Sequence, residues 1–456
     1  MERAPFLLPI ILAVSGLLSS CAHQAYEARP LDAQATAEDF THRTAESAGL
    51  AEASNWDLNA LTKAALLLHP DMQVARKRWL EAQAGQQRAA QKNNPEISLG
   101  GDHHSRAESV SPWTLKLGIG IPITTSGKRE ARMEQAAALT EAARLDIAQT
   151  AWQVRSRLRS RLLEVYALQA VMQGLQQEIF TRSEVVAMLE KRLEVGYASS
   201  LDVSDARLQL RRVEIAYQNE KAKLAEARAA LASAIGLPEA ALKMERLSLA
   251  NFEVQPTRLP SPDVQRAALQ NRLDIRRGLA EYAAAEAEVR LEIARQTPDI
   301  TLGPTYEWDQ GDNRWGLGLS LVLALFHNND AAIAEANARR ETQAAKFQRL
   351  QAEVIGQQEQ AHQGLLAALA QLENASNNLK NHQSRYEQQK KLFDAGQIDR
   401  LELTLARLEV HALEVAVTAA RVSVQQEMGL LEDVVQQPLD GSENLDAEEL
   451  SGTEAR

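Results

Sequence analysis

Residues 113–123 read WTLKLGIGIPI, and residues 315–325 read WGLGLSLVLAL. In each stretch large apolar residues alternate with small or polar ones, so a strand would have one apolar face and one small or polar face. Shorter apolar segments precede both stretches and supply partners for them. The pattern therefore predicts two β-hairpins. The partner strands are expected at 97–99 and 300–308, and the turns at 103–112 and 309–314.

Four aromatic residues stand in these strands, namely Trp113, Tyr306, Trp308 and Trp315. Alternating strands of about ten residues with aromatics near their ends are typical of outer-membrane β-barrels, where the rings lie at the membrane interface. The alternative is a pair of soluble hairpins packed on helices, which would have to bury two apolar faces. Four strands cannot close a barrel in lipid, but three protomers would supply about twelve strands.

The hairpins belong to a unit of about 200 residues that occurs twice within 56–437. Residues 65–71 (ALLLHPD) match residues 268–274 (ALQNRLD) at an offset of 203, and Gly196 recurs as Gly396 at an offset of 200. The period is too long for a solenoid, so we expect two tandem halves of one fold.

The repeat suggests six segments along the chain. They are a signal peptide (1–20), an N-terminal tether (21–55), repeat 1 (56–250, hairpin about 96–123), a linker (251–262), repeat 2 (263–437, hairpin about 299–325) and an acidic tail (438–456).

Long helical patterns flank the hairpins. They cover 56–92, 128–194, 198–235, 263–296, 330–394 and 398–435. A helix over 128–194 would be about 100 Å long, which exceeds a globular core. Apolar residues recur every seven positions along two stripes of 198–235 and again of 398–435, and the stripes lie on nearly opposite sides of each helix. A helix with a neighbour on each flank belongs to a curved wall rather than to a two-stranded coil.

The composition argues against several function classes. The chain has 61 acidic and 50 basic residues and no basic patch interleaved with aromatics, so we expect no nucleic-acid partner. Residues Arg155, Arg157, Arg159 and Arg161 are interpreted as a solvated helix face. Enzyme motifs and metal-ligand spacings are missing, and His103 and His104 are interpreted as a solvated loop pair. We therefore expect no enzyme, no cofactor and no high-affinity metal site.

Cys21 follows an apolar run of 13 residues, from Phe6 to Leu18, that suits a signal peptide and is too short to span a bilayer. The sequence Leu18-Ser-Ser-Cys21 resembles a bacterial lipoprotein box. That resemblance implies cleavage before Cys21 and acylation of its thiol. The alternative is an ordinary secretory signal with an incidental cysteine.

The turns between the long helices carry the most specific motifs. They read GYASSLDVSDA at 196–206 and GQIDRLELTLA at 396–406, and the hairpins are entered by NPE at 94–96 and left by SGKR at 126–129. With these motifs the chain resembles the outer membrane factors, the TolC-like channels of tripartite efflux and type I secretion. The resemblance implies a homotrimer with a twelve-stranded membrane β-barrel and a long α-helical periplasmic tunnel. It also implies outer-membrane localisation, a periplasmic adaptor (membrane fusion protein) and an inner-membrane transporter, here expected to be of the RND type.

In that family, acidic residues near the second-repeat turn ring the closed periplasmic end. Glu402 occupies the first acidic position of the motif and Leu405 the second, so one carboxylate ring is expected, and Asp399 could add charge. The resemblance also implies adaptor contacts around the two turns. The candidate docking residues are Gly196, Asp202, Asp205 and Gly396. The alternative is that the acids cap or solubilise exposed turns.

The strand exits SGKR at 126–129 and LFHNN at 325–329 most resemble the branch that serves heavy-metal cation exporters. Multidrug efflux and type I protein secretion stay open as alternatives, because the partner pump largely selects the substrate in such machines. A periplasmic coiled-coil adaptor lipoprotein is a further alternative. Adaptors, however, carry compact β-domains rather than two isolated hairpins of membrane type.

Overall fold

The computed structural model describes residues 25–50, 55–105, 111–253 and 271–439. The predicted signal peptide, Cys21, most of the linker and most of the acidic tail lie outside these residues. The chain divides into two compact units, one ending at Arg43 and one beginning at Thr44. In the first unit, helix α2 (Ala33–Thr41) begins after Asp32, whose carboxylate accepts hydrogen bonds from two backbone N–H groups of the first turn.

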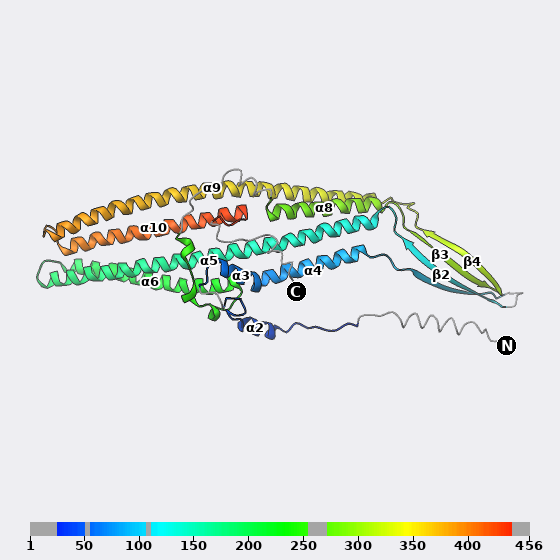
Figure 1. Ribbon diagram of the computed structural model, residues 1–456, viewed down its shortest axis with the longest axis horizontal. Helices are drawn as coiled ribbons and strands as arrows, with labels where there is room; N and C mark the ends of the chain where they lie inside the picture. Colours follow the sequence, from blue (N-terminus) through cyan, green and yellow to red (C-terminus); the bar gives the residue numbers. More distant parts are fainter. Residues whose placement is uncertain (1–24, 51–54, 106–110, 254–270, 440–456) are drawn as a thin grey trace. The chain divides into compact units, whose positions relative to one another are not determined.

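Seven helices make up most of the described part of the second unit. They are α3 (Leu58–Leu68), α4 (Pro70–Ala90), α5 (Lys128–Glu194), α6 (Ser200–Ile235), α8 (Leu273–Ala294), α9 (Asp330–Asp394) and α10 (Arg400–Val435). The long helices predicted over 128–194 and 330–394 are confirmed with the same bounds. Helix α5 packs against α4, α6, α8 and α10, while α9 packs against α8 and α10 (Figure 1). We call the contact between α5 and α10 the seam.

The single helix expected over 56–92 is wrong, because the chain breaks at His69. Helix α3 ends at Leu68, His69 is extended, and α4 starts at Pro70. A proline has no N–H to donate and is tolerated only in the first turn of a helix, so it begins α4 instead of continuing α3. The ring of His69 accepts a hydrogen bond from the Asp71 N–H at 3.2 Å.

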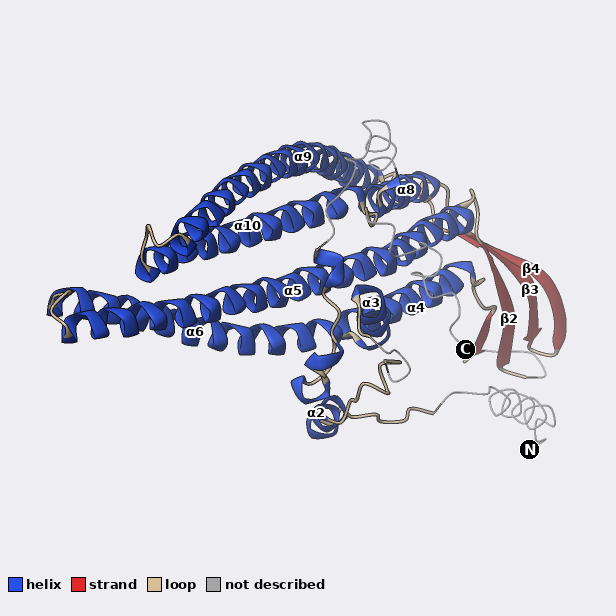
Figure 2. Cartoon of the chain, turned by 60° about the vertical axis from the view of Figure 1, so that its left-hand side comes forward, coloured by secondary structure: helices blue, strands red, loops and turns tan. Residues whose placement is uncertain are grey.

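The two predicted hairpins join into one antiparallel sheet in the order β1-β2-β3-β4 (Figure 2). The strands are β1 (Glu96–His103), β2 (Trp113–Ile123), β3 (Ile300–Asp309) and β4 (Asp312–Leu321). Strand β2 of the first repeat pairs with β3 of the second, with Leu117 opposite Tyr306. The sheet is therefore shared by both halves of the chain.

Strand β4 differs from the prediction at both ends. The turn expected over 309–314 consists of Gln310 and Gly311, both with positive φ, so Arg314 already lies in the strand opposite Glu307. The strand also ends at Leu321 rather than at 325. A two-residue turn with positive φ matches the twist of paired strands, so strand pairing begins within the polar residues 312–314 that were expected to lie in the turn.

No helix among the described residues is long and apolar enough to cross a bilayer.

The main hydrophobic core lies where α3, α5 and α6 meet, around the fully buried Leu61, Leu158 and Leu231. The end of the segment expected to be a tether belongs to this core. Leu50 is buried there, and its carbonyl accepts a hydrogen bond from the Trp56 indole at 3.2 Å. A separate cluster joins α9 and α10.

Candidate functional site

Both turns between long helices end their first helix in the same way. Gly196 and Gly396 have φ of 78° and 71°, a region that L side chains rarely occupy. The Tyr197 N–H donates to the Arg192 carbonyl at 2.7 Å, and the Gln397 N–H donates to the Leu392 carbonyl at 2.8 Å. These are Schellman caps, so each glycine has a structural reason at its position.

The helices that follow begin at acidic caps. Ser199 and Asp202 form a capping box at the start of α6, and hydrogen bonds from the Ser199 N–H and hydroxyl hold the pKa of Asp202 below its ordinary value. Asp399 caps α10 by accepting from the Glu402 N–H at 3.0 Å. Asp205 is exposed one turn further along α6. Asp202 and Asp399 therefore have a capping role.

Asp399 also joins the tips of the two repeats. The Arg192 guanidinium at the end of α5 lies 2.7 Å from the Asp399 carboxylate. The Glu402 N–H and this guanidinium together hold the pKa of Asp399 below its ordinary value. Further along the seam, Arg407 of α10 forms an ion pair with Glu184 of α5. We call these contacts, Arg192 with Asp399 and Glu184 with Arg407, the tip ion pairs.

The structure brings Asp399 and Glu402 together in the first turn of α10, while Asp202 and Asp205 lie on α6. Glu402 is exposed, as is Leu405 at the second position of the acidic motif. The cationic partner of Asp399 on α5 does not follow from any local sequence pattern.

Farther from the tips, the seam contains two buried arginines. Arg155 and Arg159 are 1% and 5% exposed, so the solvated face predicted for them is wrong. An Arg155 Nη atom donates to Glu432 of α10 at 2.8 Å, and Arg159 Nε lies 3.2 Å from the same carboxylate. Glu432 itself is fully buried. Arg157 and Arg161 on the other side of α5 are about half exposed, as predicted.

A sequence signal for this burial was present. Positions 155 and 159 are four apart and share a helix face with Trp152, Leu162 and Tyr166, so the alternate arginines fall on a stripe rich in large apolar residues. The four arginines do not share one helix face, because helix residues two apart point in nearly opposite directions.

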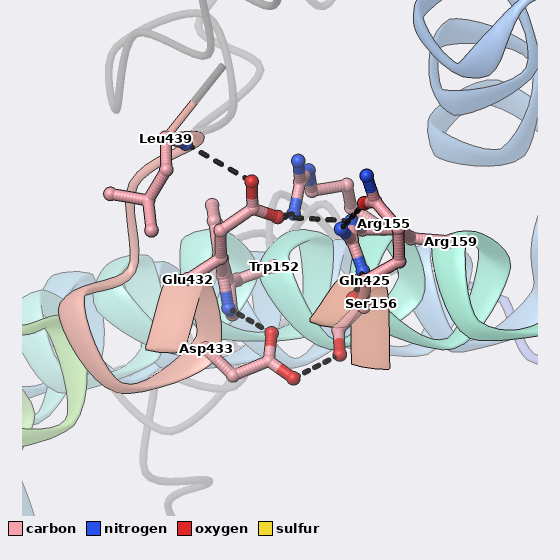
Figure 3. Close-up of polar contacts among 8 residues, drawn as sticks. All are labelled: Trp152, Arg155, Ser156, Arg159, Gln425, Glu432, Asp433 and Leu439. Atoms are coloured by element: carbon pink, nitrogen blue, oxygen red, sulfur yellow. Dashed lines mark hydrogen bonds and ion pairs between the residues drawn. The ribbon is translucent and has the colours of Figure 1, made fainter. Parts of the chain in front are cut away.

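Hydrogen bonds complete this cluster (Figure 3). Arg159 donates to the Gln425 carbonyl at 2.9 Å and to its side-chain oxygen at 3.1 Å, and the Leu439 N–H donates to Glu432 at 3.0 Å. A Cβ at Gly429 would overlap the Arg159 guanidinium, so a larger residue there would require this guanidinium to shift. We call Arg155, Arg159, Gln425 and Glu432 the buried seam cluster.

Asp433 lies beside this cluster and makes different contacts. Its carboxylate accepts hydrogen bonds from the Ser156 hydroxyl at 2.5 Å and from the Trp152 indole at 3.0 Å (Figure 3). Burial raises the pKa of Asp433, because the charged form loses water, and the two hydrogen bonds oppose this only in part.

Between the buried seam cluster and the tips, the seam opens into a shallow cleft of about 520 Å³. Its lining residues are Gln173, Gln176, Gln177, Phe180, Thr181, Arg407 and His411. The described part of the chain contains no group of three or more His, Cys, Asp or Glu side chains that could hold a metal ion.

The four strand aromatics gather near the end of the sheet that is farther from the helices. The registers place Trp113, Tyr306, Trp308 and Trp315 on the apolar face. The rings of Tyr306 and Trp315 lie 4.7 Å apart between centroids, and Trp113 contacts His103 at the same distance. They form one aromatic band on one face.

A family model for outer membrane efflux proteins matches residues 61–237 and 264–432, which is most of the chain. The chain belongs to this family. The chain is similar to the cobalt-zinc-cadmium resistance protein CzcC of Cupriavidus metallidurans, with 25% identity over 224 residues, 48% of this chain and 52% of that protein. The pyoverdine export outer membrane protein OpmQ of Pseudomonas aeruginosa is 24% identical over 299 residues, 60% of this chain and 62% of that protein. The chain thus matches between half and two thirds of the length of these curated relatives.

Solved structures agree on the fold. VceC of Vibrio cholerae superposes with a TM-score of 0.68 at 19% identity, covering 84% of this chain and 96% of that one. The outer-membrane channel OprN superposes with a TM-score of 0.70 at 17% identity, covering 92% of this chain and 98% of that one. CusC gives 0.67 at 17% identity, covering 91% and 98%. The predicted family and the TolC-like fold class are confirmed.

Proposed function

We propose that three copies of this chain form the outer-membrane channel of a tripartite efflux system and passively conduct divalent heavy-metal cations to the exterior. The observation that carries the proposal is the shared sheet, in which the first strand β1 and the last strand β4 each have one edge without a partner strand among the described residues. Open edges are not tolerated in lipid, and pairing β4 of one copy with β1 of the next removes them.

The helical part supports the same assembly. Leu201, Leu208 and Ile215 of α6 recur every seven residues and are 67%, 49% and 61% exposed. A stripe of this kind on a long helix fits a neighbouring helix, which a second copy of the chain would supply. Three copies would extend the sheet and the helical wall together.

The tips carry the proposed gate and docking surface. In the trimer, Glu402 would form one ring of three carboxylates that favours cations over anions, with Asp399 contributing charge nearby. The exposed turns around Gly196 and Gly396, with Asp202 and Asp205, would contact a periplasmic adaptor. An inner-membrane pump of the RND type would supply the energy, so the channel itself needs no catalytic residue.

Two further parts of the proposal concern the membrane. The aromatic band of Trp113, Tyr306, Trp308 and Trp315 would lie at the lipid interface, where amphipathic rings are favoured. Acylation of Cys21 would add a lipid anchor in the outer membrane.

Metal cations are the favoured cargo because the relative CzcC is described as a cobalt-zinc-cadmium resistance protein and the strand exits suit the same branch. The relative OpmQ, described as a pyoverdine export protein, favours an organic cargo as the second candidate. Export of drugs or proteins belongs to this second class.

Growth of a deletion strain on graded zinc, cobalt, cadmium, nickel and copper, with dyes and antibiotics in parallel, tests the cargo. We expect sensitivity to metals alone and rescue by the intact gene. Sensitivity to organic compounds alone would make the chain a drug-efflux channel and overturn the metal assignment.

Single-channel recording tests the proposed ring in the purified protein. Glu402→Ala together with Asp399→Ala should lower the preference for cations. Asp205→Asn is the matched control, because it removes an exposed tip acid that lies on α6. Equal selectivity in the wild type and the Glu402 and Asp399 double variant would refute the ring.

A further inference from the structure

The pairing of β2 with β3 within one chain ends in a small polar junction. The two strands pair as far as Ile123, which lies opposite Ile300. Two residues later the Thr125 N–H donates to the Asp299 carboxylate at 3.0 Å, and the Lys128 ammonium group lies 2.7 Å from the same carboxylate. Lys128 is only 8% exposed. A buried cation thus joins the two repeats where the sheet meets the helices.

The far edge of β4 has no such junction among the described residues of one chain. Strand β4 ends at Leu321, opposite the first residue of β3. The alternating residues that follow are exposed, with Leu323 at 65% and Leu325 at 77%. At an offset of 202, Leu325 corresponds to Ile123, the last residue of β2. These residues therefore lack the kind of partner that β3 gives to β2.

The repeat predicts which strand would supply that partner. Strand β1 occupies in the first repeat the place that β3 occupies in the second, so the equivalent pairing is β4 of one copy with β1 of the next. It would place Leu325 opposite Ile97 and Leu323 opposite Leu99 of the next copy. Apolar residues then meet apolar residues on one face of the sheet, as the pleat requires.

At the equivalent junction between copies, a carboxylate replaces the cation. Asp330 is the first residue of α9, as Lys128 is of α5, and each follows a residue with left-handed φ. Glu96 corresponds to Asp299 at the offset of 203. Both Glu96 and Asp330 are exposed in the single chain. Two acids would therefore meet where the chain itself has an acid and an ammonium group, and their repulsion calls for a cation between them.

A third ligand belongs to the same place. His327 corresponds to Thr125, whose hydroxyl lies 2.8 Å from the Pro298 carbonyl and 3.4 Å from the Asp299 carboxylate. An imidazole and two carboxylates are a ligand set for Zn²⁺ and related divalent transition metals. The Asp330 side chain is shorter than that of lysine, and an ion about 2.0–2.2 Å from each oxygen would fill the space left by the ammonium group.

We propose that each contact between neighbouring copies holds one divalent transition-metal ion, bound by His327 and Asp330 of one copy and Glu96 of the next. The inference rests on the proposed function, because the site is complete only when β4 of one copy pairs with β1 of another. No group of three metal ligands lies within the described residues of a single chain, as a site divided between copies requires. The ion ties the copies together and is distinct from the ions that the channel conducts.

Cysteine cross-linking tests the strand pairing on which the site depends. In a Cys21→Ser background, Leu99→Cys together with Leu323→Cys should form a disulfide between copies on oxidation, because directly opposite residues are close enough. Leu99→Cys with Leu319→Cys is the control, since it lies four residues out of register. Equal cross-linking of the two pairs, or none in the first, would refute the pairing and the site with it.

Zinc binding to the purified full chain tests the site itself. After treatment with EDTA and gel filtration, the wild type should rebind about one Zn²⁺ per copy, and bound Zn²⁺ should raise the temperature at which the trimer dissociates. Even the loss of an indirect partner costs about 10–100-fold in metal affinity, so Glu96→Gln and His327→Thr should each lower the affinity for Zn²⁺ at least about tenfold. Glu130→Gln neutralises an exposed acid in the first turn of α5 and should leave the affinity unchanged.

Asp330→Lys restores the chemistry of the junction within the chain. Its ammonium group should pair with Glu96 of the next copy, so the trimer of this variant should be as stable without Zn²⁺ as the wild type is with it. If Asp330→Lys responds to Zn²⁺ as the wild type does, or if Glu96→Gln binds as much Zn²⁺ as the wild type, the site is refuted.

These readouts separate the site from the proposed function, because they need the assembled protein but no transport. A trimer that binds no Zn²⁺ refutes the site and leaves the channel intact. A trimer that binds Zn²⁺ at this site, but whose gene does not rescue growth of the deletion strain on metals, supports the site and refutes the metal cargo alone.

Discussion

Neutralising Glu432 should destabilise the protein far more than neutralising a matched exposed glutamate. Glu432→Gln keeps the shape of the side chain but leaves Arg155 and Arg159 facing a neutral amide at 2.8 and 3.2 Å. Two unit charges about 4 Å apart interact by about 4 kcal/mol at an effective dielectric constant of about 20. Removing one partner of a buried pair costs about 3–5 kcal/mol, and we expect a loss in this range.

The matched control is Glu164→Gln on α5. Glu164 pairs with Arg161 at 2.8 Å, but both side chains are 45% exposed. An exposed pair three residues apart on a helix contributes about 0.2–0.5 kcal/mol. Thermal unfolding in detergent, followed by circular dichroism at 222 nm, compares the two variants with the wild type.

A rescue variant tests the cause of the loss. Replacing Arg155 and Arg159 with Met and Glu432 with Leu removes every formal charge of the cluster and should recover most of the stability, because no buried charge is then left unpaired. A melting temperature that Glu432→Gln lowers no more than Glu164→Gln does would contradict the role assigned to the buried charges. A triple variant that is less stable than Glu432→Gln would contradict it as well.

Three further predictions follow from the caps and the titratable groups. Gly196→Ala should lower the free energy of unfolding by about 1 kcal/mol because the φ of Gly196 is positive. Gly85→Ala inside α4 should raise it by about 0.5–1 kcal/mol, since nothing lies within 4 Å of an added Cβ, and shifts of the melting temperature with the same sign in both variants would contradict this. Burial raises the pKa of Asp433 above its ordinary 3.8, so the folded state holds this proton more tightly and the free energy of unfolding falls as the pH rises from 3.8 through the raised pKa. Asp433→Asn should remove this pH dependence from the stability measured between pH 4 and 8, and an unchanged slope would count against it. The pKa of Asp399 is lowered, so its ion pair with Arg192 is complete above pH 3.8 and is lost only as the pH falls through the lowered pKa. Asp399→Asn, which removes this charge at pH 7, should raise the open probability of the channel in planar bilayers, and an open probability equal to that of the wild type would exclude Asp399 from the gate.

The periodic parts of the fold could be predicted from the sequence. Helix α5 has the bounds expected for it, because its apolar pattern is long and Gly127 and Gly196 flank it. The strands were recognisable from strict alternation. The break at His69 and Pro70 was missed, although proline at the first position of a helix is itself a start signal.

The contacts between distant segments could not be predicted. Arg155 and Glu432 are 277 residues apart, and no local pattern states that their helices meet. The same holds for Arg192 and Asp399, where the acid alone was recognised as a tip residue. Helix periodicity gives the face of a residue but not the partner that faces it.

The pairing of β2 with β3 has a consequence for how the chain is made. Thr114 and Asp309 hydrogen-bond across 195 residues of sequence, so the second hairpin must be synthesised before the sheet can form. Until then β1 and β2 offer an unpaired apolar ribbon to any other chain, and contacts of such long range form slowly. We therefore expect biogenesis of this protein to require that the first hairpin is shielded until the second half of the polypeptide has been delivered.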